Sequence, residues 1–109
     1  MAYDEGLAER IREVLADNPE IREKKMFGGL AFMLSGNMAC GLIKEDLLVR
    51  VGPDNYEKVL SKPHARKMEF TGRPMKGFVT VEAEGLEDDK MLKAWIKQGL
   101  EYAASLPAK

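Results

Sequence analysis

Cysteine, aromatic residues and excess charge are all scarce in this sequence of 109 residues. Its one cysteine, Cys40, excludes an intramolecular disulfide and is typical of a protein from a reducing cytoplasm. Lysine and arginine number 17 against 18 aspartates and glutamates, which gives a formal net charge of −1. A chain without a basic surplus is a poor candidate for strong, non-specific binding of nucleic acid as a whole.

Long apolar runs are also missing. The longest, Gly28 to Leu34 and Met38 to Ile43, are far too short to cross a bilayer. The acidic N-terminus lacks the apolar core of a signal peptide. We therefore expect a cytoplasmic protein with no membrane partner.

The length fits one domain, residues 1–109, and no repeat or linker divides it. Apolar residues make up 45% of the chain and charged residues 32%, as in a globular protein with a solvated surface. Only 7% of the residues are aromatic, so the core must depend on Leu, Ile, Val, Met and Ala.

Helical spacing of apolar residues appears in three places. It predicts a first helix from Asp4 to Asp17, which ends before Asn18-Pro19 because a residue before proline leaves the α region. Pro53-Asp54 opens a short second helix that stops before Pro63. The last helix starts near Asp88-Asp89, acidic residues suited to a helix N-terminus, and buries a face that includes Trp95.

Strand patterns fill the space between these helices. Lys25 to Val51 contains three apolar runs separated by the polar turns Ser35-Gly36-Asn37 and Lys44-Glu45-Asp46, which predicts an antiparallel meander. Lys67 to Phe70 and Phe78 to Val81 are two further strands, and Thr71 to Gly77 between them is a loop by composition. The fold class is therefore α+β, an antiparallel sheet flanked by helices, in the order helix, three strands, helix, two strands, helix.

Both faces of the meander carry apolar side chains, although one face of an antiparallel sheet is usually polar. Leu30 and Phe32 point one way, and Ala31 and Met33 point the other. Either helices cover both faces, or one face meets a partner such as a second copy of the chain. The sequence leaves these two arrangements open.

Several segments together resemble the N-terminal domain of the TfoX/Sxy family. They are Lys25-Met26-Phe27-Gly28-Gly29, Gly36-Asn37-Met38, Cys40-Gly41, Leu47 to Val51, Pro63-His64-Ala65-Arg66, Phe70 to Gly77, and Leu92 to Leu106. Within them, the residues that we take as the family's structural motif are Met26, Phe27, Gly28, Gly29, Gly36, Gly72, Pro74 and Trp95.

This resemblance implies a fold similar to the secretion-chaperone architecture, with the same order of elements. Two-domain members of the family are regulators of bacterial competence and are thought to act as transcriptional co-activators. In those proteins a helical domain follows this one, whereas this sequence stops at Lys109. We therefore expect a stand-alone domain and place no weight on a role carried by the second domain.

Catalytic signatures are weak. Cys40 and His64 are the only thiol and imidazole, but Cys40 lies between apolar strand residues, which favours a buried, inert thiol over a nucleophile. Two such residues also fall short of a zinc site. Gly28-Gly29 leads into a strand, so a bend explains it better than a phosphate loop, with Phe27 as a core anchor and Met26 facing the other way. We expect no cofactor and no bound metal.

Basic residues gather between Lys62 and Lys76. The residues that we take as a candidate binding surface are Arg50, Arg66, Lys67, Arg73, Met75 and Lys76. An acidic stretch from Glu82 to Asp89 follows, so a solvated rim with partly paired charges is the plainer interpretation.

The favoured hypothesis is a non-enzymatic regulatory module that binds another protein. It would act through an exposed sheet face or through the Arg50, Arg73 and Lys76 surface. The alternative is binding of a small anion or nucleic acid by the segment 62–76. A minor alternative is an enzyme centred on Cys40 and His64.

Overall fold

The computed structural model of this chain describes residues 4–26, 28–70 and 73–107. Its first helix, α1 (Glu5–Val14), begins where the sequence supplies a capping side chain. The Asp4 carboxylate accepts a hydrogen bond of 3.2 Å from the Leu7 backbone N–H, which satisfies one of the unpaired donors of the first turn. Leu7, Ala8 and Ile11 form the buried stripe of this helix.

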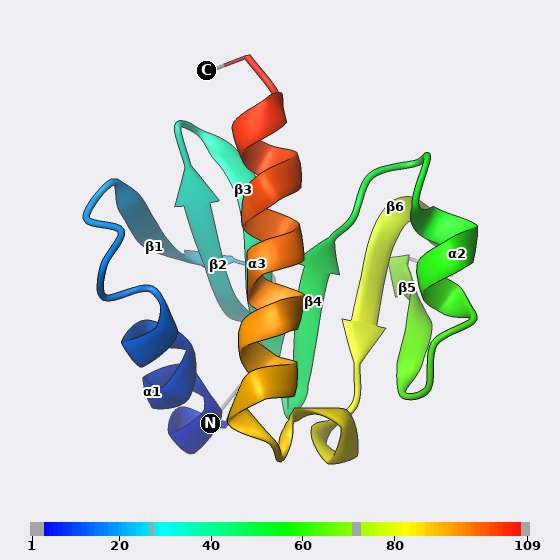
Figure 1. Cartoon of the computed structure of the whole chain (residues 1–109), viewed down its shortest axis with the longest axis horizontal. Coiled ribbons are helices and arrows are strands. Elements are labelled where there is room, and N and C mark those ends of the chain that lie inside the picture. The colour runs from blue at the N-terminus through cyan, green and yellow to red at the C-terminus, as the bar shows by residue number, and fades with distance from the viewer. Residues whose placement is uncertain (1–3, 27, 71–72, 108–109) are drawn as a thin grey trace.

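Six strands follow in one antiparallel sheet with the order β1-β2-β3-β4-β6-β5 (Figure 1). Their bounds are β1 (Ile21–Met26), β2 (Gly29–Leu34), β3 (Asn37–Ile43), β4 (Asp46–Arg50), β5 (Ala65–Phe70) and β6 (Arg73–Val81). The first four strands form a meander, and the hairpin of β5 and β6 is added to it through β6. The predicted α+β class and the coarse order of helix, strands, helix, strands, helix are confirmed.

The tight turns lie where the sequence predicts them. Ser35 and Gly36 connect β2 to β3 with φ values of 51° and 84°, and Leu34 pairs directly with Asn37. Two consecutive positive φ values are the requirement of a type I′ turn, and they match the twist of the flanking strands. Lys44, with φ of 55°, starts the turn into β4. Gly28, with φ of 75°, forms the predicted bend before β2.

The other helical elements are α2 (Tyr56–Leu60), the 3-10 turn η1 (Ala83–Leu86) and α3 (Asp89–Ser105). Asp88 caps α3 by accepting a 2.8 Å hydrogen bond from the Lys90 N–H. Trp95 is only 5% exposed, which confirms its predicted role in the core. Arg10 ties α1 to this region, because its guanidinium donates 2.6 Å to the Leu86 carbonyl.

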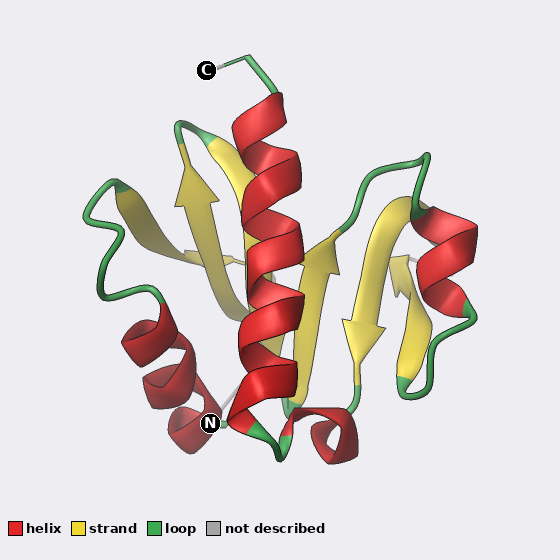
Figure 2. Ribbon diagram, in the orientation of Figure 1, coloured by secondary structure: helices red, strands yellow, loops and turns green. Residues whose placement is uncertain are grey.

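All three α-helices of the described chain lie on one side of the sheet (Figure 2). α3 crosses β3 and β4, α2 covers β5 and β6, and α1 packs beside α3. The core between these layers contains Phe32, Leu42, Val49, Trp95 and Ile96. The described helices all lie on one face, so the arrangement with helices on both faces is wrong for the described residues, and contact of the other face with a partner stays a prediction.

Two details of the prediction are wrong. No strand is predicted in the charged run before Lys25, yet Ile21–Met26 forms β1. The segment from Thr71 to Gly77, predicted to be a loop, is strand from Arg73 onward. Residues 71 and 72 of this segment lie outside the described residues. Pro74 is tolerated there because β6 pairs with β4 only from Phe78 to Val81, so no ladder on that side needs a proline N–H.

Candidate protein-binding surface

We call the side of the sheet opposite the helices the helix-free face. One row of residues on this face crosses all six strands. The register aligns them in the order Lys24, Ala31, Gly41, Leu48, Thr80 and Arg66. Neighbours in such a row point to the same face. No described helix packs against this row.

The middle of the helix-free face is nevertheless shielded by the chain itself. Ala31 and Leu48 have no exposed surface. A Cβ built on Gly41 would lie 2.8 Å from the Met38 methyl carbon, so the Met38 side chain covers the glycine. Met33, Met38 and Ile43 are half-buried and form the accessible apolar part of this face. A partner would therefore meet mobile thioethers and strand-end residues, which adapt well to varied surfaces.

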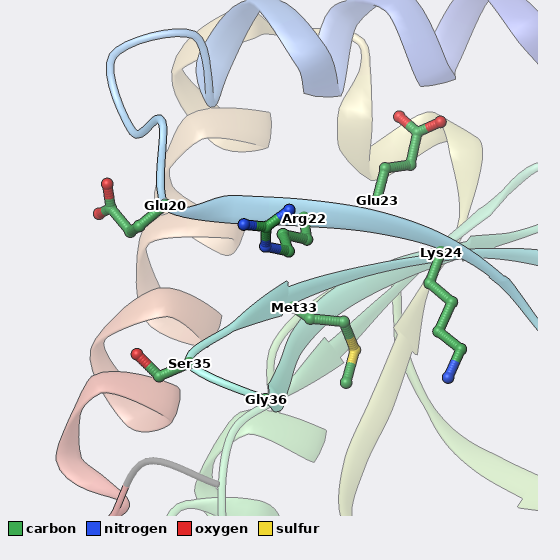
Figure 3. A pocket seen from close by; sticks show the side chains of 7 residues that line it. All are labelled: Glu20, Arg22, Glu23, Lys24, Met33, Ser35 and Gly36. Carbon is green, nitrogen blue, oxygen red and sulfur yellow. The ribbon is translucent and has the colours of Figure 1, made fainter.

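A groove of about 490 Å³ opens at the β1 end of this face (Figure 3). Arg22 and Lys24 of β1 and Met33 of β2 line it, together with Ser35 and Gly36 of the turn. Arg22 and Lys24 are exposed and make no ion pair within the described chain. Glu23, the next residue of the strand, extends toward α1 and pairs with Arg12.

Arg50, a predicted surface residue, is held in place at the end of β4. Its guanidinium carbon lies 5.4 Å from the ring centroid of Phe78 and 5.5 Å from that of Tyr102. Cation–π contacts of this kind contribute about 0.5–2 kcal/mol, depending on how far the charge is desolvated. They give Arg50 a role in fixing α3 against the sheet.

The predicted basic segment does not gather into one patch among the described side chains. By register Arg66 shares the helix-free face with Thr80, whereas Lys67 lies beside Val79 on the opposite face. Lys62 lies over the Trp95 ring on the helix side, with Nζ 5.5 Å from its centroid. Alternation along a strand separates cations that are adjacent in sequence.

The structure does not describe the side chains of four other predicted residues, which are Arg73, Pro74, Met75 and Lys76. It also does not describe those of Met26 and Phe27. Gly72 falls outside the described residues altogether. The prediction that charges of opposite sign partly pair along a solvated rim is confirmed for Arg66. Its guanidinium donates a hydrogen bond of 2.8 Å to the Glu82 carboxylate.

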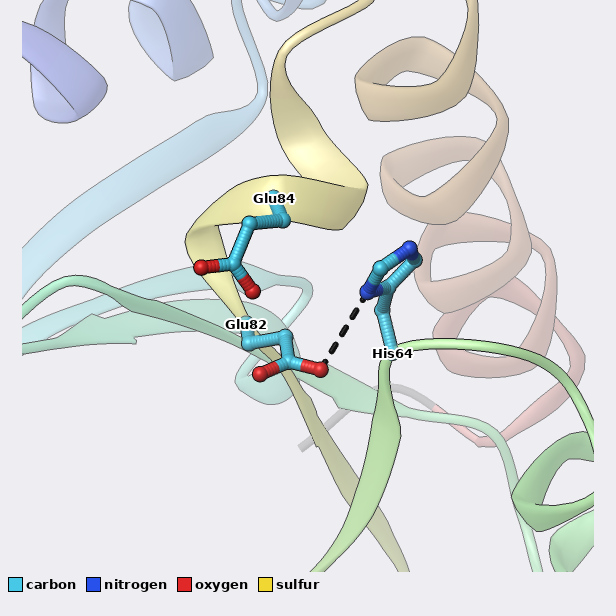
Figure 4. Close-up of side chains that lie close together, drawn as sticks. All are labelled: His64, Glu82 and Glu84. Carbon is cyan, nitrogen blue, oxygen red and sulfur yellow. Dashed lines mark hydrogen bonds and ion pairs between the residues drawn. The ribbon is translucent and has the colours of Figure 1, made fainter.

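His64, Glu82 and Glu84 form the closest cluster of metal-ligand types in the described chain (Figure 4). One ligand atom from each lies within 4.8 Å of the others. His64 Nδ1 is 3.2 Å from a Glu82 oxygen, and the second oxygen of that carboxylate accepts from Arg66. A guanidinium on a ligand carboxylate opposes a divalent cation, so the geometry fits a structural tie between β5 and β6 better than a metal site.

This tie changes the titration of Glu82. The hydrogen bond from His64, assisted by the charge of Arg66, lowers the pKa of Glu82 from its ordinary value of 4.5. A carboxylate with a lowered pKa stabilises the fold above its unfolded pKa and loses that contribution as the pH falls. Glu23 behaves in the same way because Arg12 lowers its pKa. Burial raises the pKa of Asp46, which acts in the opposite direction.

We therefore expect Glu82→Gln to make the melting temperature less sensitive to acid. Below pH 4.5 the wild-type protein loses the Glu82 contribution, whereas the variant has none to lose. Thermal unfolding followed by circular dichroism between neutral and acid pH measures the difference. Glu13→Gln, at an exposed helix position, is the control and should keep the wild-type slope. Parallel slopes for Glu82→Gln and Glu13→Gln would contradict the assignment.

Cys40 and His64 do not form a nucleophile pair. Cys40 is fully buried in β3, and burial raises the pKa of its thiol to about 12. His64 precedes β5, and β4 and β6 lie between those two strands. At a spacing of ~4.8 Å per strand, β3 and β5 are roughly 14 Å apart, so the two residues are well beyond hydrogen-bond reach.

Comparison with known protein families shows the family to which the chain belongs. A family model described as the TfoX N-terminal domain matches residues 13–103. The chain belongs to the TfoX N-terminal domain family. The match spans all six strands, α2 and nearly all of α3, so the helix-free face is part of the TfoX domain itself. A search of the curated proteins found no match.

In the described part of this TfoX domain, no helix combines the length and the apolar character that a bilayer crossing requires.

Sequence reasoning missed the cations of β1 as surface residues. The charged run from Glu20 to Lys25 is predicted to precede the first strand, so Arg22 and Lys24 are not among the predicted surface residues. The signal that was available is their spacing of two residues around Glu23, which in a strand places both cations on one face.

Proposed function

We propose that this TfoX domain is a non-enzymatic regulatory module that binds another protein through the helix-free face of its sheet. The resemblance to TfoX/Sxy regulators makes control of transcription the favoured process. Its place of action would be the cytoplasm, where a single buried thiol stays reduced. The observation that carries the proposal is the position of all three α-helices on one side of a six-stranded sheet.

The arrangement of side chains supports binding over catalysis. The one thiol is buried in the core, and the one imidazole is engaged by Glu82. The helix-free face offers half-buried Met33, Met38 and Ile43, bordered by Arg22 and Lys24. Methionine beside cations is a common composition for surfaces that recognise proteins.

Anion or nucleic-acid binding through the segment 62–76 has less support. Arg66 is paired with Glu82, and Lys62 lies against Trp95. Arg50 is held between two aromatic rings. A phosphate-binding strip needs several free cations on one face, and these three do not form one.

The test is a double charge substitution on the helix-free face. Ile43→Glu with Thr80→Glu places two carboxylates among half-buried residues of this face. A partner purified from the source organism on the wild-type domain should bind the variant at least about tenfold more weakly, because buried unpaired charge is costly at an interface. Isothermal titration with the purified partner measures the dissociation constants.

Met91→Glu with Gln98→Glu is the matched control. It adds the same charge to α3, on the opposite side of the molecule, where Met91 is 46% exposed. We expect wild-type affinity from this control, and circular dichroism verifies that both variants fold. Equal affinity of the wild type and the Ile43→Glu, Thr80→Glu variant would reject the helix-free face as the binding surface.

A further inference from the structure

β1 is a terminal strand of the sheet, with β2 as its only neighbouring strand. Within the described chain, no backbone hydrogen bond links residues 22–26 to any segment except β2. The outer edge of β1 therefore presents unpaired N–H and C=O groups, and such an edge can accept another strand.

The charges along this edge have one dominant sign. Arg22, Lys24 and Lys25 are exposed and make no ion pair in the described chain. The single acidic residue of the strand, Glu23, is already bound by Arg12 through two hydrogen bonds of 2.8 and 3.0 Å. The unpaired charges of β1 itself are therefore positive, and Glu20, just before the strand, adds one exposed carboxylate at the end of the groove.

The groove beside β1 supplies a place for the side chains of an added strand. Arg22 pairs with Met33 and Lys24 pairs with the small Ala31. Arg22, Lys24 and Met33 line the groove together with Glu20 and Glu23 (Figure 3), and Glu23 is already paired with Arg12. Arg22 and Lys24 are two residues apart and project into the same groove. An incoming strand would meet them with residues that are also two apart.

A second copy of this chain fits the edge poorly. In an antiparallel self-pairing about Glu23, Arg22 of one copy would lie opposite Lys24 of the other, and like charges directly opposite destabilise a strand pair. The same cations prevent pairing with neutral edges in general. These like-charge contacts disfavour self-pairing in that register, whereas an acidic strand would meet Arg22 and Lys24 with opposite charge.

We propose that an extended acidic segment of a partner protein adds to the sheet as a new strand beside β1. Its acidic side chains, at alternate positions, pair with Arg22 and Lys24, and its backbone takes up the free hydrogen-bonding groups of β1. This inference rests on the proposed function, because the added strand forms the margin of the surface on the helix-free face. It names the chemistry by which that surface recognises its partner.

A synthetic decapeptide of alternating glutamate and threonine is the probe, because it has β propensity and places every carboxylate on one face. We expect it to bind the wild-type domain at low salt with a dissociation constant below about 1 mM. Fluorescence anisotropy of the labelled peptide measures the affinity. In ¹⁵N spectra, those amides of residues 22–26 that do not bond to β2 should become protected from solvent exchange when the peptide binds.

Four controls separate strand addition from charge attraction. Arg22→Glu with Lys24→Glu should weaken binding at least about tenfold, whereas Lys90→Glu with Lys93→Glu, exposed on α3, should leave it unchanged. A peptide of alternating lysine and threonine should not bind. The acidic peptide carrying N-methyl groups on two adjacent central residues loses a donor on each edge, and it should also bind at least about tenfold more weakly.

Absence of binding by the acidic peptide overturns the inference, and so does equal binding by the N-methylated peptide. A dimer that Arg22→Glu with Lys24→Glu dissociates would assign the edge to self-association instead. If the peptide fails while Ile43→Glu with Thr80→Glu still abolishes binding of the native partner, only this inference falls and the proposed function stands.

Discussion

Gly99→Ala should lower the free energy of unfolding by about 3 kcal/mol, at the upper end of the cost of overpacking a core. Gly99 is the point where α3 touches the sheet, and a Cβ built there would overlap the backbone carbonyl of Ala39. A backbone carbonyl inside the strand ladder of β3 cannot move aside as the end of a side chain can. The methyl group must therefore push α3 away from the core that contains Trp95 and Ile96.

Urea unfolding followed by tryptophan fluorescence measures this loss, since Trp95 lies one turn away on the same helix. Gly6→Ala is the matched control. It makes the same chemical change in α1, where the new Cβ meets only the Asp4 carboxylate at 3.3 Å, so helix propensity should raise stability by up to about 1 kcal/mol. A loss below about 1 kcal/mol for Gly99→Ala would mean that α3 does not approach the sheet as closely as described.

Leu48→Ala should also cost about 3 kcal/mol, although Leu48 lies on the face that has no helix. It has no exposed surface, and the neighbouring strands place Gly41 and Thr80 beside it. Truncation would leave a cavity that the flat ladder around it cannot close. The change in the urea midpoint gives the measurement.

Leu34→Ala is the comparison for this second substitution, because Leu34 is half-buried at the end of β2. It should lose clearly less stability than Leu48→Ala. Similar small losses for both would show that Leu48 is open to solvent. In the structure Leu48 is buried, and the surrounding Met33, Met38 and Ile43 are half-buried.

Elements with strong local signals were predictable from the sequence. Asp4 and Asp88 mark the first residues of α1 and α3 through capping chemistry, and Ser35-Gly36 specifies its turn because both residues have positive φ. Trp95 belongs to a helical stripe whose period requires burial. In these cases the cause of the structure lies within a few residues of the chain.

Features that depend on distant pairing were not predictable. β1 is polar because its residues 22–25 are exposed at the edge of the sheet, and Glu23 pairs with Arg12 of α1. Arg73 to Gly77 reads as a loop because Pro74 and Gly77 break both regular patterns, yet β5 pairs with this segment while β4 does not reach it. Which face of the sheet the helices cover also follows only from the packing of the assembled core.

The candidate surface residues also show this difference between local signals and distant pairing. Arg50 and Arg66 were singled out by their residue type, but partners far away in the sequence engage both. Arg22 and Lys24 were overlooked, although they retain free charge beside a groove. Residue type identifies candidates, and tertiary pairing decides which of them stay available to a partner.

Methionine methyl groups report most directly on the binding surface. Met33 and Met38 lie on the helix-free face, and Met91 is exposed on α3. In ¹³C-methyl methionine spectra, addition of the purified partner should shift or broaden the Met33 and Met38 signals and leave Met91 unchanged. A change at Met91 with Met33 and Met38 unaffected would contradict binding through the helix-free face.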